Sequence, residues 1–202
     1  MKYGICGGTF DPIHMGHLLI AEAAREQLGL DRVLFIPNGN PPHKRDAVIA
    51  PAVHRMEMVR LAIMDNPHFI PDDREIKGNV AYAVDTLIQL KHENPGDVFF
   101  YIIGGDTLPE LPTWRRFEEL FRLCRFAVYP REGFSREDIA AQAKRLHDRY
   151  GLEYDVLAGP RFDLSSTDLR ERIAEGASLR YLLPDRAVRY IEDHGLYTGN
   201  GA

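Results

Sequence analysis

Short apolar runs alternate with segments of helical spacing along most of this chain, and this alternation limits the fold more than any other feature. The runs cover residues 2–6, 32–36, 69–71, 98–103, 125–129 and 154–157. Continuous apolar runs of this length suit strands buried on both faces of a parallel sheet. Strands that alternate with helices indicate the α/β class. We therefore expect a Rossmann-like, mostly parallel sheet with helices on both faces, and 98–103, the most apolar run, as a central strand.

The segments between these runs carry helix signals. Apolar spacing predicts helices over 18–28, 54–64, 82–92, 114–123, 135–150, 165–175 and 184–194. Gly29 follows the first helix as a C′ residue, and Ser135 with Asp138 forms a capping pair. In the third helix we expect three side chains to face inward: Val84, Leu87 and Ile88.

Size and charge narrow the class of protein. A chain of 202 residues suits one domain, with a Rossmann-like core over about 1–160 and a C-terminal helical part over about 165–197. The net charge of −5 argues against broad binding to nucleic acid or to anionic membranes. We expect a cytoplasmic protein, because no apolar run is long enough to span a bilayer and a strand begins too early for a signal peptide. We expect Cys6 and Cys124 to lie in buried strands as reduced thiols.

A glycine-rich turn, Gly7 to His17, joins the first strand to the first helix. Such a turn presents unpaired backbone N–H groups at the positive end of the helix dipole, where an anion binds well. Gly7 and Gly8 have no Cβ, so a phosphate could approach the main chain closely. His14 and His17 are three residues apart on one helical face and could both donate to one polyphosphate.

Other interpretations of this turn have to be weighed. A glycine pair after a strand is often only a tight turn, and histidine pairs also bind zinc. No Cys, Asp or third His nearby completes a zinc site in the sequence. The turn matches neither G-x-x-x-x-G-K-[ST] nor G-x-G-x-x-G, so it is not a P-loop or a dehydrogenase fingerprint.

A serine-rich segment, Ser165 to Arg170, opens a later helix. One N-cap needs one hydroxyl, and Ser165, Ser166 and Thr167 supply three. Arg170 lies one turn further on, where its guanidinium could bind two phosphate oxygens. Two anion sites on two helix starts predict a ligand with several phosphates, such as a nucleoside triphosphate.

Two further segments point to the same edge of the sheet. Gly104-Gly105-Asp106 follows the central strand, and ligands of open α/β sheets bind at such carboxyl ends. Residues 37–51 form a long, proline-stiffened loop of basic character, and loops of this length are often functional.

These segments carry a family resemblance. The turn Gly7 to His17 resembles the G-x-F-D-P-x-H-x-G-H signature of the nucleotidyltransferase superfamily, and Ser165 to Arg170 resembles its second signature. Further blocks resemble those of bacterial nicotinate-nucleotide adenylyltransferases, at 37–44, 82–87, 102–106 and 111–114. The resemblance implies transfer of AMP from ATP to nicotinate mononucleotide, giving nicotinate adenine dinucleotide and pyrophosphate in NAD synthesis, with Mg²⁺ required.

The resemblance also implies roles for individual residues. The ATP site consists of Gly7, Gly8, Thr9, Phe10, His14, His17, Gly104, Asp106, Ser166, Thr167 and Arg170, of which His14, His17 and Arg170 are catalytic. The mononucleotide site consists of Asn38, Lys44, Tyr82, Ala83, Asp85, Thr86, Trp114 and Arg115. Trp114 is expected to stack on the pyridine ring. No side chain is implied as a metal ligand.

One departure from the family bears on the acceptor. The family usually has Ser-Tyr-Thr where this chain has Ala81-Tyr82-Ala83. If backbone amides recognise nicotinate, activity survives the loss of these two hydroxyls. If the hydroxyls recognise it, the preference for nicotinate over nicotinamide is open.

Three other functions stay open from the sequence: transfer to another acceptor such as phosphopantetheine, ATP binding without turnover, and metal-dependent hydrolysis. The sequence identifies no protein partner and leaves self-association open.

Overall fold

In the computed structural model the chain folds around one six-stranded sheet, and the described residues are 1–39, 49–77, 82–130, 133, 135–160 and 164–198. The strands are β1 (Lys2–Gly8), β2 (Arg32–Pro37), β3 (Phe69–Pro71), β4 (Val98–Gly104), β5 (Arg125–Tyr129) and β6 (Tyr154–Val156). Their order is β3-β2-β1-β4-β5-β6, and every pair is parallel. The α/β prediction is therefore confirmed, with β4 in the centre as expected.

The order of the strands fixes where a ligand can bind. From β1 the chain runs outward to β2 and β3, then returns to place β4 on the other side of β1. Connections on the two sides of this reversal leave a crevice outside the carboxyl ends of the strands, where open α/β sheets bind ligands. The crevice here lies between the end of β1, at Gly8, and the end of β4, at Gly104.

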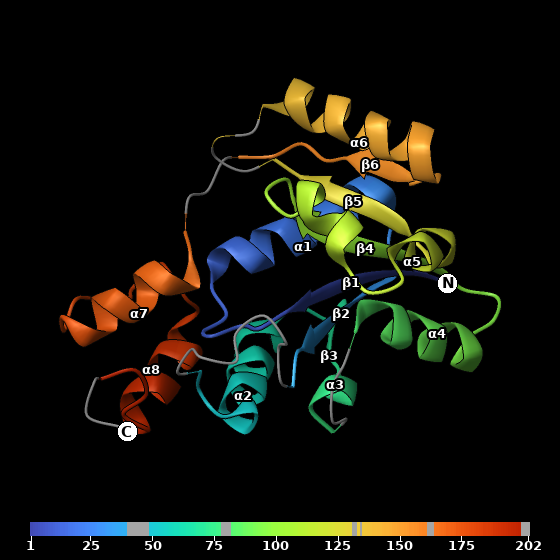
Figure 1. The fold of residues 1–202 in the computed structure, drawn as a ribbon. Helices are drawn as coiled ribbons and strands as arrows, with labels where there is room; N and C mark the ends of the chain where they lie inside the picture. Colours follow the sequence, from blue (N-terminus) through green and yellow to red (C-terminus); the bar gives the residue numbers. More distant parts are fainter. Residues whose placement is uncertain (40–48, 78–81, 131–132, 134, 161–163, 199–202) are drawn as a thin grey trace.

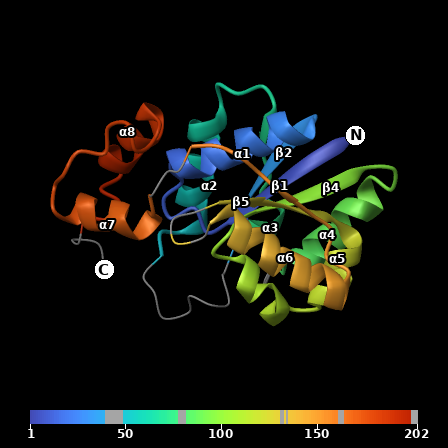
Figure 2. The same cartoon turned by 90° about the horizontal axis from the view of Figure 1, so that it is seen from above.

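Helices cover both faces of the sheet (Figures 1 and 2). The helices are α1 (Met15–Leu28), α2 (Ala52–Ile63), α3 (Arg74–Lys77), α4 (Ala83–Glu93), α5 (Phe117–Leu123), α6 (Arg136–Tyr150), α7 (Ser166–Ala174) and α8 (Asp185–Asp193), with a 3₁₀ segment η2 (Leu108–Thr113). One apolar cluster joins α1 and α2 to the sheet, and a second joins α4, α5 and α6 to its other face.

Helices α7 and α8 lie together at one end of the molecule, and α8 packs beside α2 (Figure 1). Leu169 of α7 and Ile191 of α8 belong to the same apolar cluster as α1 and α2. This shared core supports the prediction of one domain over 1–202, which stays a prediction.

Most helix ends follow the capping signals in the sequence. Gly29 adopts φ 61° after α1, and Ser135 forms a capping box with Asp138 at the start of α6. None of the described helices has the length and apolar character needed to cross a membrane.

Some local predictions are wrong. Ile88 is 37% exposed, whereas Thr86, on the same helix, is buried. Helix α5 begins at Phe117 and not at Trp114, because Trp114 ends η2 and Arg116 has a left-handed φ of 53°. Residues 74–77 form the short helix α3, which is not among the helices predicted from the sequence. Cys124 is buried but lies between α5 and β5, not within a strand.

Candidate active site

The glycine-rich turn, Gly7 to His17, leaves the sheet at the crevice. Strand β1 continues to Gly8, whose main-chain oxygen accepts a hydrogen bond from the Asn38 N–H at 2.9 Å. A Cβ on Gly7 would lie 2.6 Å from the Tyr101 hydroxyl oxygen, so a larger residue there would force the buried Tyr101 side chain to shift. This reason for glycine differs from the expected one, which was that the missing Cβ would let a phosphate approach the main chain. The turn after β1 is thus tied to the end of β2 and to β4.

The two histidines of the turn occupy different environments. His14 is the N-cap of α1 and only 1% exposed, and His17 is the third helical residue. Their rings lie 3.8 Å apart between centroids, tilted by 32°. His17 Nδ1 accepts the main-chain N–H of His14 at 3.3 Å, so a neutral His17 carries its proton on Nε2. His17 lines the cleft described below, and His14 is stacked against it.

The serine-rich segment, Ser165 to Arg170, lies directly against the glycine-rich turn. Ser166 Oγ donates to the main-chain oxygen of Pro12 at 2.9 Å, and Arg170 Nη1 donates to that of Asp11 at 2.7 Å. Arg170 Nη2 also donates to Thr167 Oγ1 at 3.2 Å, and 29% of the Arg170 side chain stays exposed. Ser165 is the N-cap of α7, in a capping box with Asp168. The two predicted anion sites are therefore neighbours in space.

A cleft of about 300 Å³ lies at the carboxyl ends of β1 and β4. It is lined by Cys6, Gly7, Gly8, Thr9, His17, Ile20, Asn38, Tyr101, Ile102, Ile103, Gly104, Asp106, Thr107 and Trp114. Eight of these are predicted site residues: Gly7, Gly8, Thr9, His17, Asn38, Gly104, Asp106 and Trp114. Burial raises the pKa of the Cys6 thiol to about 12, so this cysteine is a neutral wall of the cleft and not a nucleophile.

Some of the predicted acceptor residues make contacts through aromatic rings, and two others form polar contacts with protein side chains. Trp114 lies edge-on to Tyr101 in the cleft, with ring centroids 5.7 Å apart, and the Arg115 guanidinium lies 4.5 Å from the centroid of the Tyr82 ring. Two others contact protein groups: Asp85 pairs with Arg116 at 3.0 Å, and Thr86 Oγ1 donates to Glu75 Oε1 at 2.6 Å. Ala83 begins α4.

Several predicted residues do not line the cleft. Phe10 is 2% exposed and packs edge-on against the His17 ring with centroids 5.0 Å apart, so it supports the turn from the protein side. Lys44 and Ala81 lie outside the described residues.

Four polar residues that the sequence did not single out make contacts inside the protein: Asp11, Arg55 and Glu75 are buried, and Tyr197 is partly buried. Asp11 Oδ1 accepts the Ala50 N–H at 3.1 Å and the Tyr197 hydroxyl at 2.7 Å. Burial and the neighbouring Asp11 carboxylate raise the pKa of Tyr197, so the phenol stays protonated as this donor. The sequence indicated burial only for Arg55. It lies four residues before Val59, so both side chains are on the apolar face of α2.

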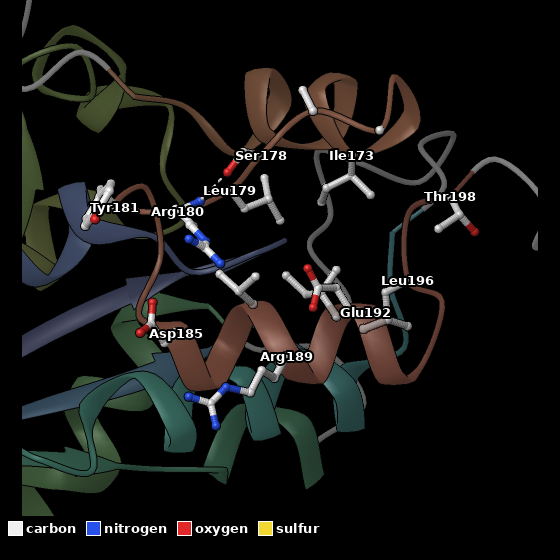
Figure 3. Close-up of a pocket in the computed structure, with 14 residues that line it drawn as sticks. Ile173, Ser178, Leu179, Arg180, Tyr181, Asp185, Arg189, Glu192, Leu196 and Thr198 are labelled. Carbon is white, nitrogen blue, oxygen red and sulfur yellow. Dashed lines mark hydrogen bonds between the residues drawn. The ribbon is translucent and has the colours of Figure 1, made fainter.

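A larger cavity of about 660 Å³ lies between the end of α7 and α8 (Figure 3). Apolar side chains from Ile173, Leu179 and Leu196 line it, with Arg180 and Glu192 at its polar edge. It contains none of the predicted site residues. Among the described residues, no group of three or more His, Cys, Asp or Glu side chains could hold a metal ion, so the zinc interpretation gains no support.

The parallel sheet, the glycine-rich turn at its edge and the serine-rich segment against that turn define a nucleotidyltransferase-type fold and site. The family model described as cytidylyltransferase-like matches residues 5–172.

More specific relatives are similar over nearly the whole chain. A protein of Dehalococcoides mccartyi named as a nicotinate-nucleotide adenylyltransferase is 42% identical over 98% of this chain and 97% of its own length. A relative of the same name from Citrifermentans bemidjiense is 41% identical over 98% of both chains. This chain belongs to the nicotinate-nucleotide adenylyltransferase family.

The fold is shared more widely. The solved Plasmodium falciparum nicotinic acid mononucleotide adenylyltransferase, complexed with NaAD, has a TM-score of 0.81 at 19% identity and covers 98% of both chains. At this identity the likeness shows the fold alone.

Proposed function

We propose that this chain transfers the AMP part of ATP to nicotinate mononucleotide, as the names of its relatives state for them. A phosphate oxygen of the mononucleotide attacks the α-phosphorus of ATP. The bond from that phosphorus to the bridging oxygen of the β-phosphate breaks, and pyrophosphate leaves with the bond's electron pair. The products are nicotinate adenine dinucleotide and pyrophosphate.

One observation carries the proposal: the serine-rich segment, Ser165 to Arg170, docks on the glycine-rich turn. The bonds from Ser166 to Pro12 and from Arg170 to Asp11 place the start of α7 beside the start of α1. Both helix starts favour anions. A single triphosphate can therefore contact both, with its α-phosphate near the turn and its outer phosphates near α7.

The attacking phosphate is already anionic, so positioning and charge stabilisation dominate the chemistry. We assign the main chain of Gly8 and Thr9 and Nε2 of His17 to the reacting phosphate, with the buried His14 ring supporting His17. We assign Ser166, Thr167 and Arg170 to the departing pyrophosphate. Gly104 and Asp106 line the cleft at and just after the end of β4, and we assign them to the adenosine.

The acceptor lies on the Trp114 side of the cleft in this proposal. Trp114 offers a ring for the pyridine, and Asn38 lines the same cleft from the end of β2. Tyr82, Ala83 and Arg115 lie at the start of α4 and before α5, where the first-turn amides of α4 favour a carboxylate. Asp85 and Thr86 act through Arg116 and Glu75 to position α4, and Lys44 remains the proposed contact to the mononucleotide phosphate.

We further propose Mg²⁺ as the cofactor that enters with ATP. Mg²⁺ in nucleotide sites is held by phosphate oxygens, water and one or two carboxylates, so it does not require a protein cage. The donor set fits this, because Asp106 provides a carboxylate in the cleft. When bound, the metal would neutralise charge on the phosphates.

We also propose a cytoplasmic location, which the two free, buried cysteines support. Whether copies of the chain associate stays open.

Pyrophosphate release tests the function directly. Purified protein with ATP and Mg²⁺ is offered nicotinate mononucleotide, nicotinamide mononucleotide or phosphopantetheine. We expect rapid release with nicotinate mononucleotide and formation of the dinucleotide. Faster release with phosphopantetheine, or ATP binding without release, would overturn the proposal in favour of one of the other functions.

A further inference from the structure

Arg55 lies in the first turn of α2 and is only 1% exposed, although it carries a charged guanidinium. Each nitrogen of this group donates to a main-chain oxygen. Nη1 donates to Thr9 at 2.7 Å, Nη2 to Gly39 at 2.9 Å and Nε to Ala50 at 2.9 Å. One buried side chain thus joins three separate segments of backbone.

Two of these segments are walls of the cleft. Thr9 lines the cleft from the glycine-rich turn, and Gly39 directly follows Asn38, which lines it from the end of β2. The third, Ala50, precedes α2 and donates its own N–H to Asp11 at 3.1 Å. The donors of Arg55 therefore connect the proposed phosphate side of the cleft to the proposed acceptor side.

The burial of this charge shows that the position depends on the guanidinium. Burial lowers the pKa of Arg55, and the nearby Asp11 carboxylate opposes this shift. A buried charge is tolerated where its hydrogen-bonding groups are satisfied. Only a planar guanidinium supplies three nitrogens in a fixed fork for three carbonyls, and a lysine ammonium would satisfy fewer of them.

We infer that Arg55 is a positioning residue for adenylyl transfer: it holds the turn at Thr9 in a fixed relation to the segments at Gly39 and Ala50, and hence ATP in a fixed relation to its acceptor. This inference rests on the proposed function. Arg55 is buried and does not line the cleft itself. It acts through the main chain of Thr9, which lines the cleft.

The expected effect falls on turnover. The turn keeps other contacts without Arg55, namely Asn38 N–H to Gly8 and Arg170 to Asp11, so ATP should still bind. What is lost is the relative placement of the two substrates. A displacement of about 1 Å in a reacting pair can lower a rate by about 100-fold.

The test compares Arg55→Lys with Ile63→Ala. Ile63 is 3% exposed at the other end of the same helix and lies in the apolar core, so its truncation destabilises α2 without touching these three carbonyls. For each variant, kcat and KM for both substrates are measured well below its melting temperature, and Kd for ATP is measured by calorimetry. Arg55→Met, of similar length without donors, provides a second variant.

We expect Arg55→Lys to lower kcat by roughly 10- to 100-fold and to raise KM for the acceptor, with Kd for ATP changed less than about fivefold. Ile63→Ala should have a lower melting temperature than the wild type and a nearly unchanged kcat. The inference is overturned if Arg55→Lys keeps the wild-type kcat, or if Ile63→Ala lowers kcat as much as Arg55→Lys does. If the wild-type protein itself shows no transfer, the proposed function fails and the inference fails with it, a result distinct from a wild-type rate in the variant.

Discussion

The Ser166 hydroxyl donates a hydrogen bond to the main-chain oxygen of Pro12 at 2.9 Å, although 154 residues separate the two in the chain. This contact brings the start of α7 to the glycine-rich turn. Neither segment alone specifies more than a general anion site. Together they bring two helix starts side by side, which is the arrangement that the proposed function requires for a polyphosphate.

Replacing Ser166 by Ala removes this contact and a proposed pyrophosphate ligand. We expect kcat/KM for ATP to fall by roughly 10- to 100-fold, since a hydrogen bond to a charged group contributes about 1.5–3 kcal/mol. Steady-state pyrophosphate release measures the change.

Ser135→Ala provides the matched control for Ser166→Ala. Ser135 caps α6 in a box with Asp138 and lies away from the cleft. Loss of an N-cap costs about 1 kcal/mol of stability. Denaturant unfolding should show that loss with kcat/KM unchanged, and an equal loss of activity in the two variants would contradict the role of Ser166.

His17→Ala should lower kcat far more than it weakens ATP binding. His17 lines the cleft, and because its Nδ1 accepts the His14 N–H, a neutral ring carries its proton on Nε2. Removal of one preorganised donor to a transition state costs roughly 3 kcal/mol, about 100-fold in rate. Single-turnover kinetics and ATP calorimetry separate the two effects.

His147→Ala is the control for His17→Ala, because His147 lies in the last turn of α6, where its Nδ1 donates to the main-chain oxygen of Leu152 at 2.9 Å. It should keep the wild-type kcat. Unchanged turnover in His17→Ala would remove His17 from the mechanism.

Ala83 offers a test of acceptor choice. It begins α4, and the first-turn amides of a helix favour a carboxylate over a neutral amide. We therefore expect the wild-type protein to prefer nicotinate mononucleotide over nicotinamide mononucleotide. Ala83→Thr restores one hydroxyl usual in the family and should change this preference by less than about tenfold. Equal kcat/KM for both acceptors in the wild type would show that backbone amides do not discriminate.

The sequence predicts those parts of the molecule that depend on local patterns. Strands such as Phe69–Pro71 and Arg125–Tyr129 are bounded by prolines or turns and were predicted to the residue. The contact between the glycine-rich turn and the serine-rich segment is consistent with the prediction that both lie at one ligand site, whereas each segment alone also allowed a tight turn or a helix cap.

Long-range polar contacts could not be predicted in this way. Tyr197 reaches Asp11 across 186 residues, and no local pattern marks either as a partner of the other. Thr86 is buried in place of Ile88 because its hydroxyl pairs with Glu75, from a short helix that the sequence did not reveal. Trp114 lies outside α5 because Arg116 breaks the helical path, a conformation that arginine rarely adopts.

Glu75 predicts a pH dependence of stability. Burial raises its pKa above the ordinary 4.5, with the Thr86 hydrogen bond acting in the opposite direction. The native state therefore holds this proton more tightly than the unfolded state does. Stability from this group is complete below pH 4.5 and is lost as the pH rises through the higher native pKa. Each pH unit inside this window costs up to about 1.4 kcal/mol.

Glu75→Gln removes this titration while its amide oxygen can still accept the Thr86 hydroxyl, which donates at 2.6 Å in the wild type. Urea unfolding of both proteins from pH 4.5 to 8 measures the difference in their free energies of unfolding. We expect the difference to move in favour of Glu75→Gln as the pH rises. A difference that stays constant would show that the native pKa of Glu75 is not raised, and one that moves in favour of the wild type would show that it is lowered; either result would contradict this prediction.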